Sequence, residues 1–255
     1  MRAAGENAYC RHTLVNISHA GRERIFEELA VVGYNREVCG KLLLPETYPD
    51  KDVRRCPGHT GQPPIPGIVR REEATPREGY IPVGFSSWRS SEKGRLCIPS
   101  FAHPGEIVAA WPPESAFARA LSLPRNSLRA TKAMRAVAKL LDMREAVPAE
   151  LGLWGAAALE IQTGYPYTHD WSDLDILLTM RQPSGLEELR RCLSVVAALE
   201  KECAIRVDAE VTLPSGYGIP LKEVLQSGAT VLGKGARDVV LMRKEEALAS
   251  LGRMP

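Results

Sequence analysis

The segment SDLDILL, residues 172–178, decides how this chain is interpreted. An apolar run that follows acidic residues is typical of a buried strand, and side chains two apart on a strand leave the same face of the sheet. Asp173 and Asp175 would therefore share one face, about 6.6 Å apart along the backbone. Two such carboxylates repel each other unless a cation lies between them, and Mg²⁺ binds carboxylate oxygens together with substrate phosphates. The segment predicts a magnesium site, although a short DxD motif alone also fits an exposed strand end.

Two neighbouring segments favour the functional interpretation. Gly155, in LWGAAALE, lies where an apolar strand would turn into a helix, and the free backbone N–H groups of a helix start can hold a phosphate. Further on, RVDAEV presents Asp208 and Glu210, again two apart within an apolar run, as candidates for a third carboxylate beside the first pair. A turn glycine, a DxD strand and a third acidic strand together predict metal-dependent phosphoryl or nucleotidyl transfer.

The pattern along the chain predicts an α/β protein in two parts. Short apolar runs bounded by Gly, Pro and Ser favour a smaller, mainly β N-terminal module over residues 1–112, with a long proline-rich loop at 45–66. From residue 113 to 255, two helices broken near Pro124 precede alternating strands and helices, which is typical of a mixed sheet flanked by helices. The long helix at 184–202 is expected to begin with a capping box of Ser184 and Glu187.

Composition excludes several classes of protein. The chain has 255 residues, 44% hydrophobic and 25% charged, with a formal net charge of +2, so we expect a folded domain with no nucleic-acid polymer as its partner. It contains neither a segment of about 18 apolar residues nor a signal-peptide core, which predicts a cytoplasmic protein that does not bind membranes. The six scattered cysteines form no CxxC pair and are expected to be reduced.

The core stretch WGAAALEIQTGYPYTHDWSDLDILL, residues 154–178, resembles a branch of the nucleotidyltransferase superfamily. That branch is the phosphoribosyl-dephospho-CoA transferase family, the holo-acyl-carrier-protein synthases of malonate decarboxylase. The early HTLV, GIVRRE and KGRLCIP, and the later RVDAEV, LKE and VLGK, are similar in kind and order. The resemblance implies a nucleotidyltransferase-like fold for residues 113–255. It also implies an enzyme that moves phosphoribosyl-dephospho-CoA from 2'-(5''-triphosphoribosyl)-3'-dephospho-CoA to a serine of the apo acyl carrier subunit of malonate decarboxylase, releasing diphosphate.

The resemblance also implies roles for the core residues. Asp173 and Asp175 would hold Mg²⁺ on the triphosphate, and Asp208, or alternatively Glu210, would complete the metal site or help to deprotonate the serine. Gly155 would let backbone amides bind the phosphates. The residue after this glycine is usually Ser in the family and is Ala156 here, so one hydroxyl contact to phosphate is missing.

Other residues are weaker candidates for substrate binding. Lys234, in TVLGKGARD, is similar to a family lysine that would neutralise the triphosphate, and Arg70 and Arg71 would face it from the N-terminal module. Each also fits an ordinary solvated position. Aromatic residues before the DxD strand would either stack on the adenine or pack under their own loop, namely Tyr165, Tyr167 and His169.

Two alternatives to this function remain at the level of sequence. One is a different nucleotidyltransferase, which adenylylates a small molecule or a protein with ATP. The other is a decayed member that only binds the carrier protein or a nucleotide, for which Ala156 is the one argument.

A basic stripe that would attract an acidic carrier is also predicted along one helix after Pro124, opposite an apolar side. Its residues are Arg125, Arg129, Lys132 and Lys139.

Overall fold

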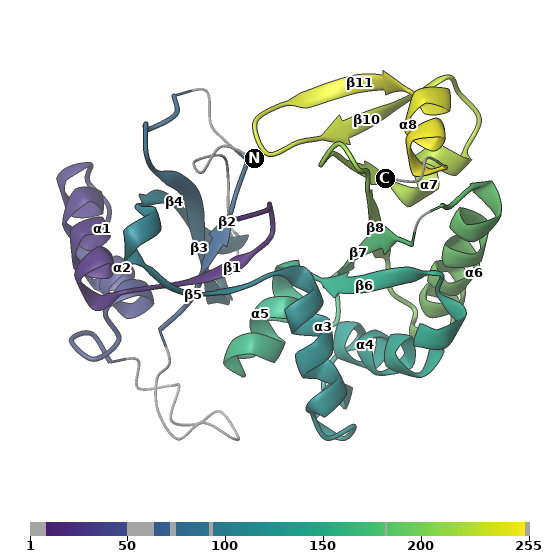
Figure 1. Cartoon of the computed structure of the whole chain (residues 1–255). Helices are drawn as coiled ribbons and strands as arrows, with labels where there is room; N and C mark the ends of the chain where they lie inside the picture. The colour runs from purple at the N-terminus through teal and green to yellow at the C-terminus, as the bar shows by residue number, and fades with distance from the viewer. Residues whose placement is uncertain (1–8, 50–63, 72–74, 92–93, 182, 253–255) are drawn as a thin grey trace. The chain divides into compact units, whose positions relative to one another are not determined.

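The computed structural model describes residues 9–49, 64–71, 75–91, 94–181 and 183–252 (Figure 1). By its contacts the chain divides into two compact units. Unit 1 comprises residues 1–112 and the segment Thr163–Tyr167, and unit 2 comprises Pro113–Gln162 and Thr168–Pro255. The first change from unit 1 to unit 2 lies between Pro112 and Pro113, and the return of residues 163–167 to unit 1 was not predicted from the sequence. Two sheets with flanking helices confirm the predicted α/β class.

Unit 1 is built on an antiparallel five-stranded sheet of order β4-β3-β2-β1-β5. Val83 and Phe85 are buried two residues apart on β3, and Phe85 pairs with the buried Ile98 of β4, so these side chains lie on one covered face. The helix α2 (Arg36–Leu43) was not predicted from the sequence, because it is short and contains Gly40. The elements are β1 (Leu14–Ile17), α1 (His19–Val31), α2 (Arg36–Leu43), β2 (Gly67–Val69), β3 (Ile81–Ser91), β4 (Gly94–Ala102) and β5 (Ile107–Trp111). Most of the loop predicted at 45–66 lies outside the described residues.

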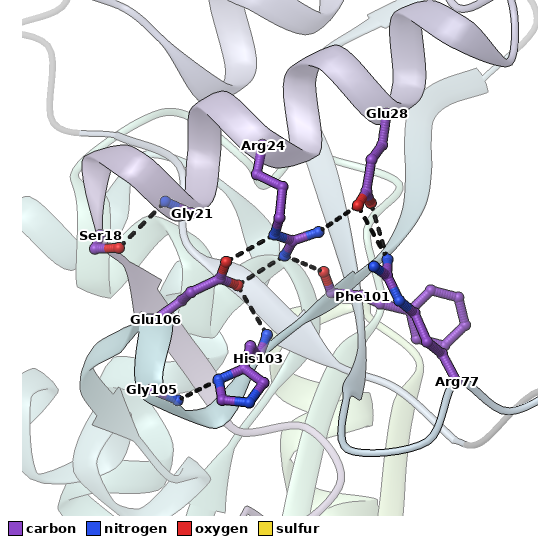
Figure 2. A network of polar contacts seen from close by, with 9 residues as sticks. All are labelled: Ser18, Gly21, Arg24, Glu28, Arg77, Phe101, His103, Gly105 and Glu106. Carbon is purple, nitrogen blue, oxygen red and sulfur yellow. Dashed lines mark hydrogen bonds and ion pairs between the residues drawn. The ribbon is translucent and has the colours of Figure 1, made fainter.

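A network of arginines and carboxylates ties α1 to the end of β4 and the start of β5 (Figure 2). Arg24 contacts Glu106 through two hydrogen bonds of 2.7 Å and also donates to the backbone oxygen of Phe101 at 2.9 Å. Glu28 forms an ion pair with Arg24 at 2.8 Å and accepts a hydrogen bond from Arg77 at 3.0 Å. Two cations thus balance two anions, and Arg24 and Glu106 are mostly buried, at 25% and 20% exposure of their side chains. The network holds the helix on the sheet.

The segment Thr163–Tyr167 completes unit 1 although it follows a helix of unit 2. Tyr167 is fully buried and its hydroxyl donates to the backbone oxygen of Ser86 at 2.9 Å. Arg95 of β4 donates to the backbone oxygen of Tyr167, and Tyr165 stacks on Trp88 with ring centroids 6.0 Å apart. Of the two roles considered for these tyrosines, the structure supports packing under the loop, because neither ring is accessible to a ligand.

Unit 2 is built on a mixed six-stranded sheet of order β11-β10-β9-β8-β7-β6. Only β7 and β8 run parallel, and the long helix α6 makes the crossover that such a pair needs. The strands are β6 (Ala149–Leu153), β7 (Leu174–Met180), β8 (Val207–Thr212), β9 (Gly218–Pro220), β10 (Thr230–Lys234) and β11 (Val239–Arg243). The helices are α3 (Pro113–Ser122), α4 (Lys132–Met143), α5 (Gly155–Thr163), α6 (Leu186–Cys203), α7 (Leu221–Leu225) and α8 (Lys244–Leu251).

The two central strands of unit 2 have an apolar face and a polar face. Leu174, Ile176 and Leu178 of β7 are at most 1% exposed, and Val207 and Val211 of β8 are at 0%. These side chains fill the core between the sheet and the helices α4 and α6, which pack against β7, β8 and each other. Burial of one face leaves the alternating acidic positions on the other face, so the strand period places them together.

Two local predictions need correction. The capping residues of α6 are one position later than expected, because Gly185 is the N-cap and its N–H donates to Glu188 at 2.9 Å. The predicted basic stripe is wrong, because α4 begins at Lys132 after the capping hydroxyl of Thr131, so Arg125 and Arg129 precede the helix. The opposite side of α4 is buried as predicted, through Met134, Val137 and Leu141.

The described residues contain no helix that is long and apolar enough to cross a membrane. The five described cysteines, Cys10, Cys39, Cys97, Cys192 and Cys203, are free thiols, in agreement with the expectation from their spacing. Cys56 lies outside the described residues.

Candidate active site

The DxD pair lies at the start of β7. Asp175 is the second residue of the strand and Asp173 directly precedes it, so both lie on the polar face, two residues apart. The strand begins here because Leu174 can be buried completely while its neighbours stay polar. The strand predicted from SDLDILL is therefore confirmed, and it carries the two carboxylates on the side away from the α4 and α6 core.

Gly155 begins α5 directly behind Asp175. Its φ of +64° lies in the left-handed region, which favours glycine. A β-carbon at this position would also collide with the Asp175 carboxylate. The backbone N–H of Trp154 donates to the Asp175 backbone oxygen at 3.2 Å, which fixes the turn against the strand. Glycine is thus required at position 155 for two reasons, the backbone conformation and the close approach of the Asp175 carboxylate. The first turn of α5, which contains Ala156, therefore begins beside Asp175.

Asp208 is the direct neighbour of Asp175 on the adjacent parallel strand. The register of β7 and β8 pairs Asp175 with Asp208 and Leu177 with Glu210. All four side chains therefore leave the same face. Glu210 differs from Asp208 in its environment, because it is only 6% exposed and its carboxylate fills the space beside Gly218, where a β-carbon would collide with it. The Asp208 side chain is 40% exposed, which makes it the more accessible of the two candidate acids.

Arg206 lies among the acids and was not singled out from the sequence. Its guanidinium donates to both oxygens of Asp208, at 2.8 and 2.9 Å, and to Asp173 at 3.2 Å. Sequence could have shown its place on the acidic face, because it precedes Asp208 by two residues. That the same guanidinium also reaches Asp173 depends on the pairing of β7 with β8.

The acids of this face outnumber the nearby positive charge. Burial, followed by the negative charges of Asp208 and Asp173, raises the pKa of Asp175 to about 7, while Arg206 acts in the opposite direction. A carboxylate with so high a pKa lies where a further positive charge would be stabilised. The electrostatics of the face thus suit a cationic ligand.

The donor set suits Mg²⁺ only in part before a substrate is present. Within the described ranges, no group of three or more His, Cys, Asp or Glu side chains is arranged so as to hold a metal ion by itself. Two of the three predicted ligands are engaged by Arg206 instead. Mg²⁺ commonly binds through one or two carboxylates and substrate phosphates, so the registered pair of Asp175 and Asp208 is compatible with a site that the substrate completes. The metal assignment stays a prediction.

Lys234 of β10 lies on the acidic face of the sheet, two strands away from β8. It pairs with Gly218 of β9, which in turn pairs with Thr212 of β8, and directly paired residues point to the same side. Because Gly218 has no side chain, no side chain on β9 separates Lys234 from Glu210 at this position. Arg70 and Arg71 belong to unit 1, where they follow β2 and are exposed, so their role in substrate binding stays a prediction.

An aromatic pair precedes the DxD motif. His169 and Trp171 stack with ring centroids 5.1 Å apart and an interplanar angle of 22°. A turn presents them, since His169 N–H donates to Ser172 Oγ at 2.8 Å and Ser172 N–H to the His169 oxygen at 3.0 Å. Trp171 is 79% exposed, which is unusual for so large an apolar side chain. Sequence analysis named His169 but missed Trp171, and the signal for it was its position two residues before Asp173.

The chain is similar to a family of known proteins. Residues 120–245 match the family model described as the phosphoribosyl-dephospho-CoA transferase MdcG C-terminal domain. A protein of Pseudomonas aeruginosa named phosphoribosyl-dephospho-CoA transferase is 29% identical over 186 residues, which are 73% of this chain and 81% of that protein. One of the same name from Xanthomonas axonopodis pv. citri is 27% identical over 178 residues, 70% of this chain and 78% of that one. No solved structure matches the chain.

The family match covers the strands β6 to β11, all the predicted acids, Gly155 and Lys234. Residues 1–119 lie outside the match, whereas the segment Thr163–Tyr167 of unit 1 lies within it. The relatives support a transferase, and the resemblance of this chain to the phosphoribosyl-dephospho-CoA transferases, predicted from the stretch at residues 154–178, is confirmed.

Proposed function

We propose that the chain transfers the phosphoribosyl-dephospho-CoA group from 2'-(5''-triphosphoribosyl)-3'-dephospho-CoA to a serine of the apo acyl carrier subunit of malonate decarboxylase. The names of the similar proteins support the transferred group. The acceptor, the nucleotidyltransferase class and the need for Mg²⁺ are part of the proposal. The observation that carries it is the registered pair of Asp175 and Asp208, with Gly155 against Asp175, inside the stretch that matches the family.

The proposed reaction is a substitution at the first phosphorus of the triphosphate. The serine oxygen forms a bond to this phosphorus, the bond to the second phosphate breaks, and diphosphate leaves. Mg²⁺ held by Asp173 and Asp175 would neutralise the triphosphate and stabilise the leaving diphosphate. Asp208 is the acid nearest to the pair, and either completes this site or accepts the proton of the serine.

Two further features suit the donor. The backbone amides at the start of α5 become available beside Asp175 and would donate to the phosphates, with Ala156 contributing no hydroxyl. The exposed ring of Trp171, already stacked on His169, offers an apolar surface two residues from Asp173 for the adenine of the donor. Lys234 lies on the same face and would add a positive charge toward the phosphates.

Intact mass spectrometry of the carrier subunit tests the proposal. The full chain is incubated with apo carrier, Mg²⁺ and either the triphosphoribosyl precursor or ATP. We expect the carrier to gain the mass of phosphoribosyl-dephospho-CoA with the precursor only, with one diphosphate released per carrier. A carrier whose acceptor serine is replaced by Ala is the acceptor control, and Asp175→Asn is the enzyme control.

Other products would change the assignment. A gain of adenylate with ATP would make the chain a different nucleotidyltransferase. No gain with either donor, from a folded enzyme that still binds the carrier, would make it a binding protein and overturn the proposal.

A further inference from the structure

We propose that Arg206 is a phosphate-binding residue that occupies the carboxylates until a divalent cation takes its place. In the free protein its guanidinium holds Asp173 and Asp208 together. When the cation binds these acids, the guanidinium turns to the triphosphate of the donor. The ligand class rests on the proposed function, whereas the exchange of one cation for another rests on the geometry of the acidic face alone.

The guanidinium and a metal ion require the same oxygens. Arg206 donates to both oxygens of Asp208 and to one of Asp173. A divalent cation needs those lone pairs, since the carboxylate oxygens are its ligands. The two positive charges also repel each other at such short range. Metal binding to Asp173 or Asp208 therefore requires Arg206 to give up at least part of its contacts.

The side chain of Arg206 can make this exchange at low cost. Its backbone is held in the sheet, because the N–H of Leu174 donates to the Arg206 oxygen at 3.0 Å. Its side chain is 65% exposed, with partners that are 39% and 40% exposed. Ion pairs this exposed contribute only about 0.2–1 kcal/mol, so a divalent cation can displace the guanidinium. The backbone anchor nevertheless keeps the displaced group beside the site.

Phosphate is the partner that fits the displaced guanidinium. Its planar fork of donors matches phosphate oxygens as well as carboxylates, and it stays charged at every working pH. The donor would bring a triphosphate to the same cation, which places phosphate oxygens within a side chain's length of Arg206. Arg206 would then neutralise the acids before the cation and the donor bind, and the phosphates of the donor afterwards.

Two binding measurements on Arg206→Gln test the inference without the transfer reaction. The first is the affinity for Mn²⁺ alone, measured by the loss of the free-ion electron paramagnetic resonance signal. We expect it to rise about two- to fivefold, because a competing cation is removed. The second is the affinity for inorganic triphosphate at saturating Mn²⁺, measured by calorimetry. We expect it to fall about tenfold, because a charged donor is lost.

The opposite signs are the essential result. Arg191→Gln is the matched control, since Arg191 is 59% exposed and pairs with Glu187 on α6, and both affinities should stay at the wild-type value. Arg206→Lys keeps the charge without the fork, so its triphosphate affinity should lie between those of wild type and Arg206→Gln. Melting temperatures verify that each variant is folded.

Several outcomes would overturn the inference. If Arg206→Gln lowered both affinities, the residue would have only a structural role. If it left Mn²⁺ binding unchanged, the guanidinium would not compete with the cation for the carboxylates. If triphosphate binding stayed unchanged while Mn²⁺ bound more tightly, the guanidinium would not bind phosphate. Failure of the carrier-loading experiment with both expected shifts intact would reject the proposed reaction and leave the cation exchange standing.

Discussion

The two units each contain a cluster of arginine and carboxylate side chains, and the two clusters differ in charge balance and burial. In unit 1, Arg24 and Arg77 face Glu28 and Glu106, and the central pair is at most 25% exposed. In unit 2, Arg206 contacts both Asp173 and Asp208, Asp175 contributes a further acid, and the guanidinium is 65% exposed. In the first cluster two cations balance two anions, whereas in the second one guanidinium faces three acids.

This difference separates structural from functional electrostatics. A balanced and largely buried network lowers the pKa of Glu106, mainly through its hydrogen bonds from Arg24, and so stabilises the fold. Burial, followed by the negative charges of Asp208 and Asp173, raises the pKa of Asp175, so a cationic ligand would be stabilised beside it. The charge balance and burial of the two clusters, with which these opposite pKa shifts agree, therefore predict that the first cluster holds the fold and that the second binds a charged ligand.

The largest expected effect comes from removing an acid of the second cluster. Asp175→Asn, and likewise Asp173→Asn, should lower the rate of transfer by a factor of about 10³ or more, because the proposed Mg²⁺ site would lose a ligand. The melting temperature should not fall, since the substitution relieves repulsion without a loss of packing. Carrier loading and thermal unfolding measure the two quantities. Near-full activity with Mg²⁺ would show that these acids do not hold the metal.

The dependence of stability on pH sharpens this comparison. A carboxyl group whose pKa is higher in the folded than in the unfolded state destabilises the folded protein as the pH rises. The loss extends from the unfolded pKa, about 3.9 for Asp, to the folded pKa. For Asp175 in metal-free protein, this loss should extend from about pH 4 to about pH 7. Glu106 has a lowered pKa and should behave oppositely, losing stability as the pH falls below about 4.3. Unfolding of Asp175→Asn with a chelator present should lack the first dependence and keep the second.

The next largest effect should distinguish the two candidate third acids. Asp208→Asn should lower transfer by about 10², because Asp208 is paired with Asp175 and is accessible to substrate. Glu210→Gln should retain more activity, because Glu210 is buried beside Gly218, away from a ligand. Steady-state rates of carrier loading measure the difference. The reverse ranking would move the role to Glu210.

A stability effect of moderate size is expected in the first cluster. Glu106→Gln leaves the mostly buried Arg24 without its two charged hydrogen bonds, which should lower the free energy of unfolding by about 1–3 kcal/mol. Transfer per folded molecule should stay unchanged. Chemical denaturation and carrier loading check the two halves of this expectation, with Glu27→Gln, which affects an exposed ion pair, as the matched control. A stability change equal to that of the control would mean that the network does not hold α1.

The smallest effect concerns the aromatic stacks of the two units. Trp88 stacks on the buried Tyr165, whereas His169 stacks on the exposed Trp171. Trp171→Ala should raise the Michaelis constant for the donor about three- to tenfold, with the constant for the carrier and the melting temperature unchanged. Trp171→Phe should restore most of the affinity. An equal rise in both Michaelis constants would place the ring at the carrier instead.

Local pattern was sufficient for most elements of unit 2 and for the acids of its site. The apolar run after Asp173 and the alternation in RVDAEV predict strands, and a period of two places their acids on one face whatever the rest of the chain does. Gly155 could be anticipated for a similar reason, because a strand that turns abruptly into a helix favours a residue with positive φ. Each of these inferences depends on interactions within a few residues of the chain.

Contacts between distant segments decided the rest. The pairing of Asp175 with Asp208 and the contact of Arg206 with Asp173 both depend on how the neighbouring strands β7 and β8 align after an eighteen-residue helix between them. The same is true of residues 163–167, whose tyrosines are buried in unit 1 although their neighbours in sequence belong to unit 2. Sequence determined which groups carry charge and which face they share. Only tertiary packing determined which charges meet, because Coulomb interactions and burial depend on distance in space and not on separation along the chain.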